Sequence, residues 1–276
     1  MESKGANMYK LIAVDLDETL LNNDGTICKR NLDAVQKLIE AGKWFVPCSG
    51  RGYATIQGTL KDLGLYQKEN QYIVGFNGGM ITENKGNREL YYQGITYDET
   101  NMFFQKGMNY DVCMHIYTKD VVYIWNFNPG ERAFLSGRQQ TVELQEPSIE
   151  FLKNEPLVKI LYQNTDVNYL RSIAKELEDI TGPFDVSYSS NRYLEFNRAG
   201  INKGAGLRKL AEILGIDISE IIAVGDNNND MAMIRAAGLG AGVANCTDEV
   251  RRICDYVSEA DNEGGGVAEI IEKFML

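Results

Sequence analysis

The stretch "AVDLDETLLN", residues 13–22, carries three acidic residues directly after an apolar run. The run Leu11–Val14 predicts a buried strand, yet it ends in Asp15, and Asp17 and Thr19 follow at intervals of two. Acidic residues are poor strand formers, so the strand has to end here. The acids could belong to a plain turn, as Asn22–Gly25 does, or they could be presented at the strand end for chemistry. The rest of the chain has to decide between these two interpretations.

The composition is that of an ordinary globular protein and argues against several functions. The chain has 276 residues, 44% of them apolar and 24% charged, which suits one large domain or two smaller ones. A net charge of −11 argues against a nucleic-acid surface, but local cations and a metal would still let a cleft bind a phosphorylated small molecule. No apolar run reaches the roughly 18 residues of a membrane span. The polar start, MESKGANMYK, predicts no secretory signal peptide.

Cysteine and histidine usage narrows the chemistry further. The five cysteines include no CxxC pair, which favours free thiols in a cytoplasmic protein over a disulfide framework. His115 is the only histidine, so multi-histidine zinc sites are excluded, and a histidine triad or phosphohistidine chemistry would have to use this residue. It alternates with apolar residues in DVCMHIY, which predicts a partly buried strand residue rather than a catalyst.

The first and last thirds of the chain alternate strands with amphipathic helices. Strands are expected at 9–15, 43–51, 72–79, 221–226 and 239–243. Helices are expected at 31–42, 53–64, 203–215, 230–238, 248–255 and after residue 266. This spacing predicts an α/β fold with a doubly wound, Rossmann-like parallel sheet.

The middle of the chain has a different pattern, in which aromatic residues alternate with polar ones. Such alternation is typical of antiparallel strands with one solvated face, and helices are expected at 97–108 and 167–180. We therefore predict a core of residues 1–84 and 198–276, with an α+β domain of residues 85–197 inserted into it. The hinges are expected near Glu83–Asn84 and Arg198–Gly200.

Four polar stretches are expected at the carboxyl ends of strands or at helix starts, where doubly wound sheets bind ligands. Each has a simpler interpretation by itself: Ser49-Gly50 could be a turn, and Lys203 a solvated lysine. The DNNND stretch is similar to half of a calcium loop, but Met231 and Ala237 occupy the positions that require Gly and Glu. The four stretches are Asp15-x-Asp17-x-Thr19, Ser49-Gly50-Arg51, Lys203-Gly204, and GDNNND with Asp226 and Asp230.

In this order, and with a domain inserted between the second and third, the four stretches resemble the haloacid dehalogenase superfamily. The resemblance is to its Cof-type (subclass IIB) phosphatases, which carry a large α/β cap, and it covers nearly the whole chain. It extends to FNGG at 76–79 and DNEGGGVAEII at 261–271. The chain departs from the family pattern at Glu18, where Gly is commonest, and has Ser49 for the commoner Thr.

The resemblance implies a Mg²⁺-dependent phosphatase that acts on small phosphorylated metabolites such as sugar phosphates. Asp15 would be the nucleophile and form an aspartyl-phosphate, and Asp17 would be the general acid and base. The implied metal site comprises Asp15, Asp226, Asp230 and the backbone carbonyl of Asp17. The implied phosphate- and substrate-binding residues are Thr19, Ser49, Gly50, Arg51, Asn77, Lys203 and Asn229.

Two other functions stay open at this stage. The same fold supports phosphomutases and other phosphotransferases, which also use an aspartyl-phosphate. A catalytically idle binding or regulatory module is a third candidate, although it has kept every expected catalytic residue. The physiological substrate, the cap residues that select it, the oligomeric state and the roles of Glu18 and His115 are left open by the sequence.

Overall fold

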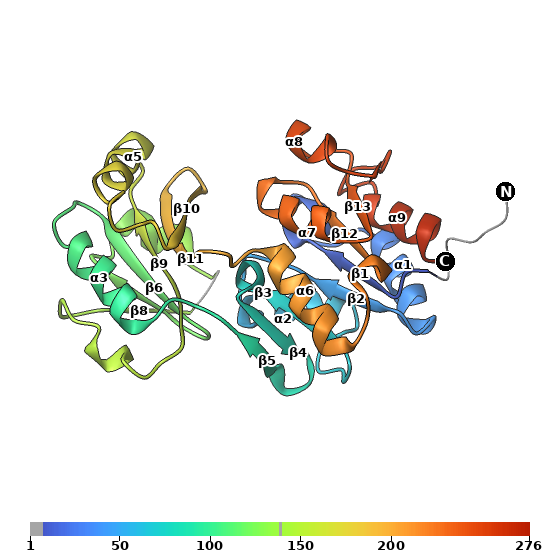
Figure 1. Ribbon diagram of the computed structural model, residues 1–276, viewed down its shortest axis with the longest axis horizontal. Coiled ribbons are helices and arrows are strands. Elements are labelled where there is room, and N and C mark those ends of the chain that lie inside the picture. Colours follow the sequence, from blue (N-terminus) through green and yellow to red (C-terminus); the bar gives the residue numbers. More distant parts are fainter. Residues whose placement is uncertain (1–7, 138–139) are drawn as a thin grey trace. The chain divides into compact units, whose positions relative to one another are not determined.

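The computed structural model describes residues 8–137 and 140–276, and the chain within it divides into two compact units. The first unit comprises Met1–Tyr92 and Asn202–Leu276, and the second comprises Gln93–Ile201. In Figure 1 the blue and orange-to-red ends of the chain share the first unit, while the green and yellow middle forms the second. The first seven residues, on which the expectation about a signal peptide rests, lie outside the described residues.

The first unit is built on a parallel sheet of five strands in the order β14-β13-β12-β1-β2. All of its pairings are parallel, as the alternation of strands and helices predicts. Its strands are β1 (Leu11–Val14), β2 (Trp44–Pro47), β12 (Ile221–Gly225), β13 (Leu239–Gly242) and β14 (Tyr256–Val257). Its helices are α1 (Lys29–Glu40), α2 (Gln57–Asp62), α6 (Lys203–Leu214), α7 (Met231–Ala236), α8 (Asp248–Arg251) and α9 (Gly266–Phe274).

Helices cover both faces of this sheet, which explains the continuous apolar runs of its central strands. Successive side chains of β1 point to opposite faces. Ile12 and Val14 join a core that includes residues of α1 and α9, whereas Leu11 and Ala13 join a second core with residues of α6. The fold class is therefore the α/β class with a parallel core sheet that the sequence predicts.

A small antiparallel sheet extends the first unit beyond β2. It contains β3 (Tyr72–Gly75), β4 (Met80–Glu83) and β5 (Arg88–Tyr92) in that order, and an isolated parallel bridge joins Cys48 to Val74. Because β5 pairs with β4, the structure divides the chain after Tyr92 instead of at the expected hinge near Glu83–Asn84. The second division, after Ile201, lies close to the expected Arg198–Gly200.

The second unit has a six-stranded sheet in the order β10-β11-β9-β6-β7-β8. Its neighbours pair antiparallel, as expected, except that β7 and β8 are parallel. Its strands are β6 (Cys113–Thr118), β7 (Val122–Trp125), β8 (Thr141–Glu143), β9 (Leu157–Gln163), β10 (Phe184–Ser189) and β11 (Tyr193–Arg198). Its helices are α3 (Tyr97–Gly107), α4 (Pro129–Leu135) and α5 (Val167–Glu176).

Helices α3 and α5 pack on one face of this second sheet through an aromatic core. Phe103 of α3 stacks on Phe196 of β11 with ring centroids 4.2 Å apart, and Leu170 and Ile173 of α5 belong to the same core. The alternation in β6 sends Met114 and Ile116 into this core. The alternate residues of this strand, Cys113, His115 and Tyr117, point to the other face.

Candidate active site

The carboxyl ends of neighbouring strands bring the expected polar residues together in the first unit. Asp15 follows β1, Ser49 follows β2 and Asp226 follows β12, and these three strands are neighbours in the parallel sheet. Asn77 follows β3, which adjoins β2 through the Cys48–Val74 bridge. Parallel strands that end at one edge of a sheet therefore explain how residues from distant parts of the sequence converge.

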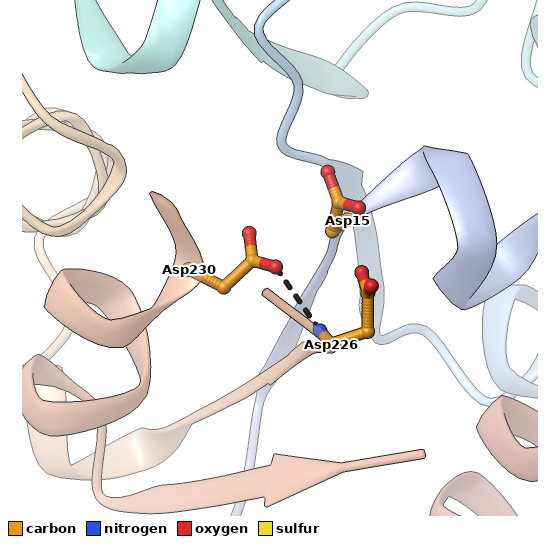
Figure 2. A group of neighbouring side chains, drawn as sticks. All are labelled: Asp15, Asp226 and Asp230. Carbon is orange, nitrogen blue, oxygen red and sulfur yellow. Dashed lines mark hydrogen bonds between the residues drawn. The ribbon is translucent and has the colours of Figure 1, made fainter. Parts of the chain in front are cut away.

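Three buried carboxylates form the centre of the site. Asp15, Asp226 and Asp230 are 6%, 4% and 0% exposed, and each offers an oxygen within 4.8 Å of the other two. Figure 2 shows the Asp15 side chain facing those of Asp226 and Asp230, which come from the segment after β12. Burial raises the pKa of Asp15 to about 7, against the effect of Lys203, and burial raises the pKa of Asp226 to about 6.

Burial disfavours the charged form of both carboxyl groups, and the neighbouring Asp230 adds to the rise in pKa, so a bound cation would favour the ionised form of each. Carboxylate oxygens are hard ligands of the kind that Mg²⁺ takes. Asp15 and Asp226 therefore have the donor chemistry and the excess charge that suit a divalent cation.

Lys203 supplies the ammonium that contacts two of these carboxylates. It is the first residue of α6 and is fully buried. Its Nζ donates to an oxygen of Asp15 and, at 2.6 Å, to Oδ1 of Asp230. Burial alone would lower the pKa of Lys203, but the two carboxylates outweigh burial and raise it. The lysine thus stays charged beside Asp15.

Glycines allow the start of α6 to approach the site closely enough for this contact. A Cβ on Gly204 would lie 2.3 Å from the carbonyl oxygen of Ala232 in α7. A Cβ on Gly78 would lie 2.2 Å from the carbonyl oxygen of Asn202, and Gly78 has a φ of +96°. Only residues without a side chain fit at these two positions, so the glycines of KGAG and FNGG position Lys203.

The second carboxylate oxygen of Asp230 organises the loop that carries Asp226. It accepts hydrogen bonds from the backbone amides of Asp226 and Asn227, both at 3.0 Å. A Cβ on Gly225 would lie 2.4 Å from the Asp230 side chain, so glycine is needed there as well. Both oxygens of Asp230 have protein partners, which makes it an orienting residue for Lys203 and Asp226.

The turn after Asp15 places Asp17 and Thr19 differently. Thr19 is fully buried, and its hydroxyl donates to Oδ1 of Asp226 at 2.7 Å. Its contact in this structure is thus with a carboxylate, and phosphate binding by Thr19 stays a prediction. Asp17 is half-exposed and forms a bidentate ion pair with Arg51, whose Nε lies 3.0 Å from Oδ2. Glu18, which lies between Asp17 and Thr19 in the chain, has a φ of +60°, a left-handed conformation that glycine adopts most easily.

The remaining residues that the sequence predicts for the site differ in their exposure and in their hydrogen bonds. The buried hydroxyl of Ser49 accepts a hydrogen bond from the Arg51 amide at 3.1 Å, and the Ser49 carbonyl accepts from the Asn77 amide at 2.9 Å. Gly50 leaves room for Asn77, because a Cβ there would lie 3.3 Å from its side-chain oxygen. That oxygen is buried and has no hydrogen-bond partner among the described residues. Asn229 lies exposed on the turn before α7.

Two further observations concern other expectations from the sequence. His115 lies in β6 of the second unit and is fully buried, deeper than the partly buried strand residue that the sequence predicts. Among the described residues, no helix combines the length and the apolar character needed to cross a membrane.

Sequence reasoning missed Asn31, Asn245 and Asn262, whose side-chain amides donate to the backbone of the turn after Asp15. Asn245 stands out in the sequence only as part of an unused glycosylation pattern, Asn245-Cys246-Thr247. No local pattern identifies a side chain that contacts a backbone carbonyl 227 positions away, as Asn245 does with Glu18.

Comparison with known proteins places this geometry in context. Residues 12–271 match the family profile of haloacid dehalogenase-like hydrolases. The chain is 27% identical over 270 residues to the 5-amino-6-(5-phospho-D-ribitylamino)uracil phosphatase YcsE of Bacillus subtilis, covering 97% of this chain and 96% of that protein. It is 28% identical over 271 residues to a phosphoglycolate phosphatase of Methanobrevibacter smithii, covering 96% and 98%.

A solved structure extends the similarity to three dimensions. The crystal structure of a haloacid dehalogenase-like hydrolase from Bacteroides thetaiotaomicron matches with a TM-score of 0.85 at 29% identity. The match covers 96% of this chain and 99% of the other.

Proposed function

This chain belongs to the haloacid dehalogenase-like hydrolases and is a phosphatase, and from that premise we propose that it hydrolyses small phosphomonoesters with Mg²⁺ through a phosphorylated Asp15. The observation that carries the proposal is the position of Asp15. Its carboxylate is buried, lies among two other carboxylates and accepts a hydrogen bond from the Lys203 ammonium. A nucleophilic carboxylate needs such cations because a phosphomonoester dianion repels it.

In the proposed site, Asp15 and Asp226 would hold Mg²⁺ together with the backbone carbonyl of Asp17, and the bound ion would offset the repulsion between the carboxylates and the phosphate. Asp15 attacks phosphorus, and the bond between phosphorus and the ester oxygen breaks as the phosphoryl group moves to Asp15. Lys203 and Ser49 stabilise the transferring oxygens, the lysine by charge and the serine by its hydroxyl.

Asp17 is proposed to protonate the leaving alcohol and then to take a proton from the water that hydrolyses the phosphorylated Asp15. Its half-exposed carboxylate pairs with the guanidinium of Arg51. For Asp17 to act on substrate, Arg51 has to exchange this carboxylate for another anion. A phosphate oxygen of the substrate is a suitable anion, because guanidinium binds phosphate and carboxylate in the same bidentate geometry. Gly50, Asn77, Thr19 and Asn229 complete the proposed binding site.

The substrate is proposed to be a small phosphorylated metabolite, with sugar phosphates as one class. The named relatives act on different esters, phosphoglycolate and a phosphorylated ribitylamino-uracil. At identities of 27% and 28% neither name can be transferred to this chain. A cytoplasmic location forms part of the proposal, since all five cysteines are free thiols in the structure.

The test is phosphate release from a panel of phosphorylated metabolites and one generic aryl phosphate. We expect release that stops in excess chelator, returns with Mg²⁺ and stays low with Ca²⁺, whose looser coordination positions a nucleophile poorly. Full activity in excess chelator would contradict the requirement for a metal. Phosphate release from none of the esters would contradict the proposed hydrolysis of phosphomonoesters. A requirement for a bisphosphate activator would instead favour a phosphomutase.

A further inference from the structure

Side-chain amides from three distant segments hold the turn that follows Asp15. They come from α1, from the loop after β13 and from the loop before α9. Each donates to a backbone carbonyl of the turn. The pairs are Asn245 to Glu18 at 2.8 Å, Asn262 to Leu21 at 2.9 Å and Asn31 to Leu20 at 3.3 Å.

The amides are themselves anchored through their oxygens. Oδ1 of Asn245 accepts from the backbone amide of Asn262 at 3.0 Å. Oδ1 of Asn31 accepts from the backbone amide of Ala268 at 2.9 Å. Asn31 and Asn262 are 0% and 4% exposed. Both ends of Asn245 and Asn31 are therefore used, which fixes the direction in which each amide donates.

The turn needs support because its central residue is strained. Glu18 has a φ of +60° and a ψ of 8°, where a residue with a Cβ is disfavoured. Its neighbours are Asp17, the proposed acid and base, and Thr19, which orients Asp226. If Glu18 relaxed to a right-handed conformation, the chain direction would change between these two residues, and both side chains would leave their positions.

We propose that Asn245, anchored by Asn262, is a positioning residue for the phosphatase reaction. By binding the Glu18 carbonyl it keeps that residue left-handed, and so keeps Asp17 and Thr19 in register with Asp15 and Asp226. A glycine at position 18 would take this conformation without the clamp. The inference rests on the proposed function, since it assigns Asn245 a part in that reaction.

The test is a double-mutant cycle that combines Asn245→Asp with Glu18→Gly. Asn245→Asp keeps an oxygen for the Asn262 amide but removes the donor to Glu18. We expect kcat to fall about tenfold or more while KM changes less than about threefold, because Ser49, Asn77 and Lys203 lie on other segments and stay in place. Amide hydrogen exchange of residues 16–21 should become about tenfold faster.

Glu18→Gly should rescue the Asn245→Asp variant. In Asn245→Asp combined with Glu18→Gly, kcat and exchange should return to within about threefold of Glu18→Gly alone. Asn245→Ala, which removes the donor without adding charge, should give the same pattern. Asn109→Asp is the matched control, because Asn109 also donates to a backbone carbonyl, at 3.2 Å, but lies in the second unit. It should leave kcat and exchange unchanged.

Wild-type kinetics and exchange in both Asn245 variants would overturn the proposal, and so would a loss that Glu18→Gly fails to restore. Hydrogen exchange also separates this proposal from the proposed function. If the wild-type protein released phosphate from no ester, the phosphatase reaction would fail as a proposal. The exchange of residues 16–21 in the Asn245 and Glu18 variants would still decide whether Asn245 clamps Glu18.

Discussion

Asp15 accepts its hydrogen bond from the ammonium of a fully buried lysine, so the charge balance of the site depends strongly on Lys203. Its Nζ forms ion pairs with both Asp15 and Asp230. Removing one partner of a buried ion pair leaves an uncompensated charge, which costs far more than the pair itself contributes.

Lys203→Met should therefore reduce both stability and turnover. We expect the free energy of unfolding, measured by urea titration in chelator, to fall by about 3 kcal/mol. The loss should be smaller in Mg²⁺, which in the proposed site would compensate the same carboxylates, and kcat should fall at least about 100-fold. Lys209→Met is the matched control, because Lys209 pairs with exposed Glu212 and should cost less than about 1 kcal/mol. Equal losses in the two variants would contradict the assigned role of Lys203.

Single residues also mark the limit of what the sequence can predict. Asp15, Ser49 and Asp226 stand where an apolar run ends, so their convergence at one sheet edge follows from the parallel order of the strands. The contact of Thr19 with Asp226 joins positions 207 residues apart, and nothing near either residue signals it. The strain at Glu18 comes from its φ of +60°, and in the sequence only the departure from the commoner Gly at this position points to it.

At the scale of elements, α6 is the helix whose packing places Lys203. Its first turn lies against α7 and the 76–79 turn, and glycines make both approaches possible. The sequence predicts this helix from its apolar spacing, but the close approach depends on backbone atoms of other segments. Such contacts between distant backbones leave no periodic pattern.

Gly204→Ala should displace α6 from α7. The added Cβ would meet the backbone of Ala232 at 2.3 Å, and backbone cannot yield as a flexible side chain does. We expect a loss of about 1–3 kcal/mol in urea denaturation, together with a loss of turnover. Gly58→Ala in α2 is the control, since its Cβ meets nothing within 4 Å and should stabilise by about 0.5–1 kcal/mol. A neutral Gly204→Ala would contradict the close approach of the two helices.

The second sheet carries an unusual histidine. His115 is fully buried, and neither ring nitrogen has a hydrogen-bond partner among the described residues. Burial lowers its pKa to about 3, and the cations Lys159 and Arg192 contribute to the decrease. The nearest carboxylate, Glu131, lies 3.6 Å from Nε2. The folded protein therefore keeps His115 neutral at pH values where the unfolded chain protonates it.

This difference makes stability depend on pH. Between pH 6.5 and about 3 the unfolded chain binds the extra proton, so stability should fall with decreasing pH by up to about 1.4 kcal/mol per unit from this residue alone. His115→Gln should remove that part of the slope. Urea denaturation of the wild type and of His115→Gln between pH 7 and 5 separates the contribution of His115 to the pH dependence from that of the carboxylates. Identical slopes would contradict a neutral buried His115.

At the scale of the whole molecule, the two units correspond to the two kinds of sequence pattern. The change from buried to alternating strands predicts an inserted domain, but it places the first boundary too early. Residues 88–92, RELYY, carry aromatic residues as the strands of the second unit do, although β5 completes the small sheet of the first. β5 is an edge strand in which every residue is exposed or partly buried, so its composition could not separate it from the strands of an inserted domain.

Two deletions test the boundaries and the role of the second unit. Joining Tyr92 to Asn202 through a short flexible linker keeps β5, whereas removing residues 85–197 exposes β4 as a sheet edge. We expect the first variant to fold, to keep part of the hydrolysis of a generic aryl phosphate and to lose discrimination among metabolites. The second should aggregate. Undiminished selectivity in the first variant would contradict a specificity role for the second unit.

The most direct measurement of the central claim is the mass of the phosphorylated protein after an acid quench. Asp17→Asn should keep the nucleophile but slow the hydrolysis of the phosphorylated Asp15. An activated phosphate ester should therefore add one phosphoryl group to the peptide that contains residue 15. Asp15→Asn, a nearly isosteric change, should show neither the adduct nor turnover. A phosphoryl group on another peptide, or near-normal turnover in Asp15→Asn, would contradict the assignment of Asp15 as the nucleophile.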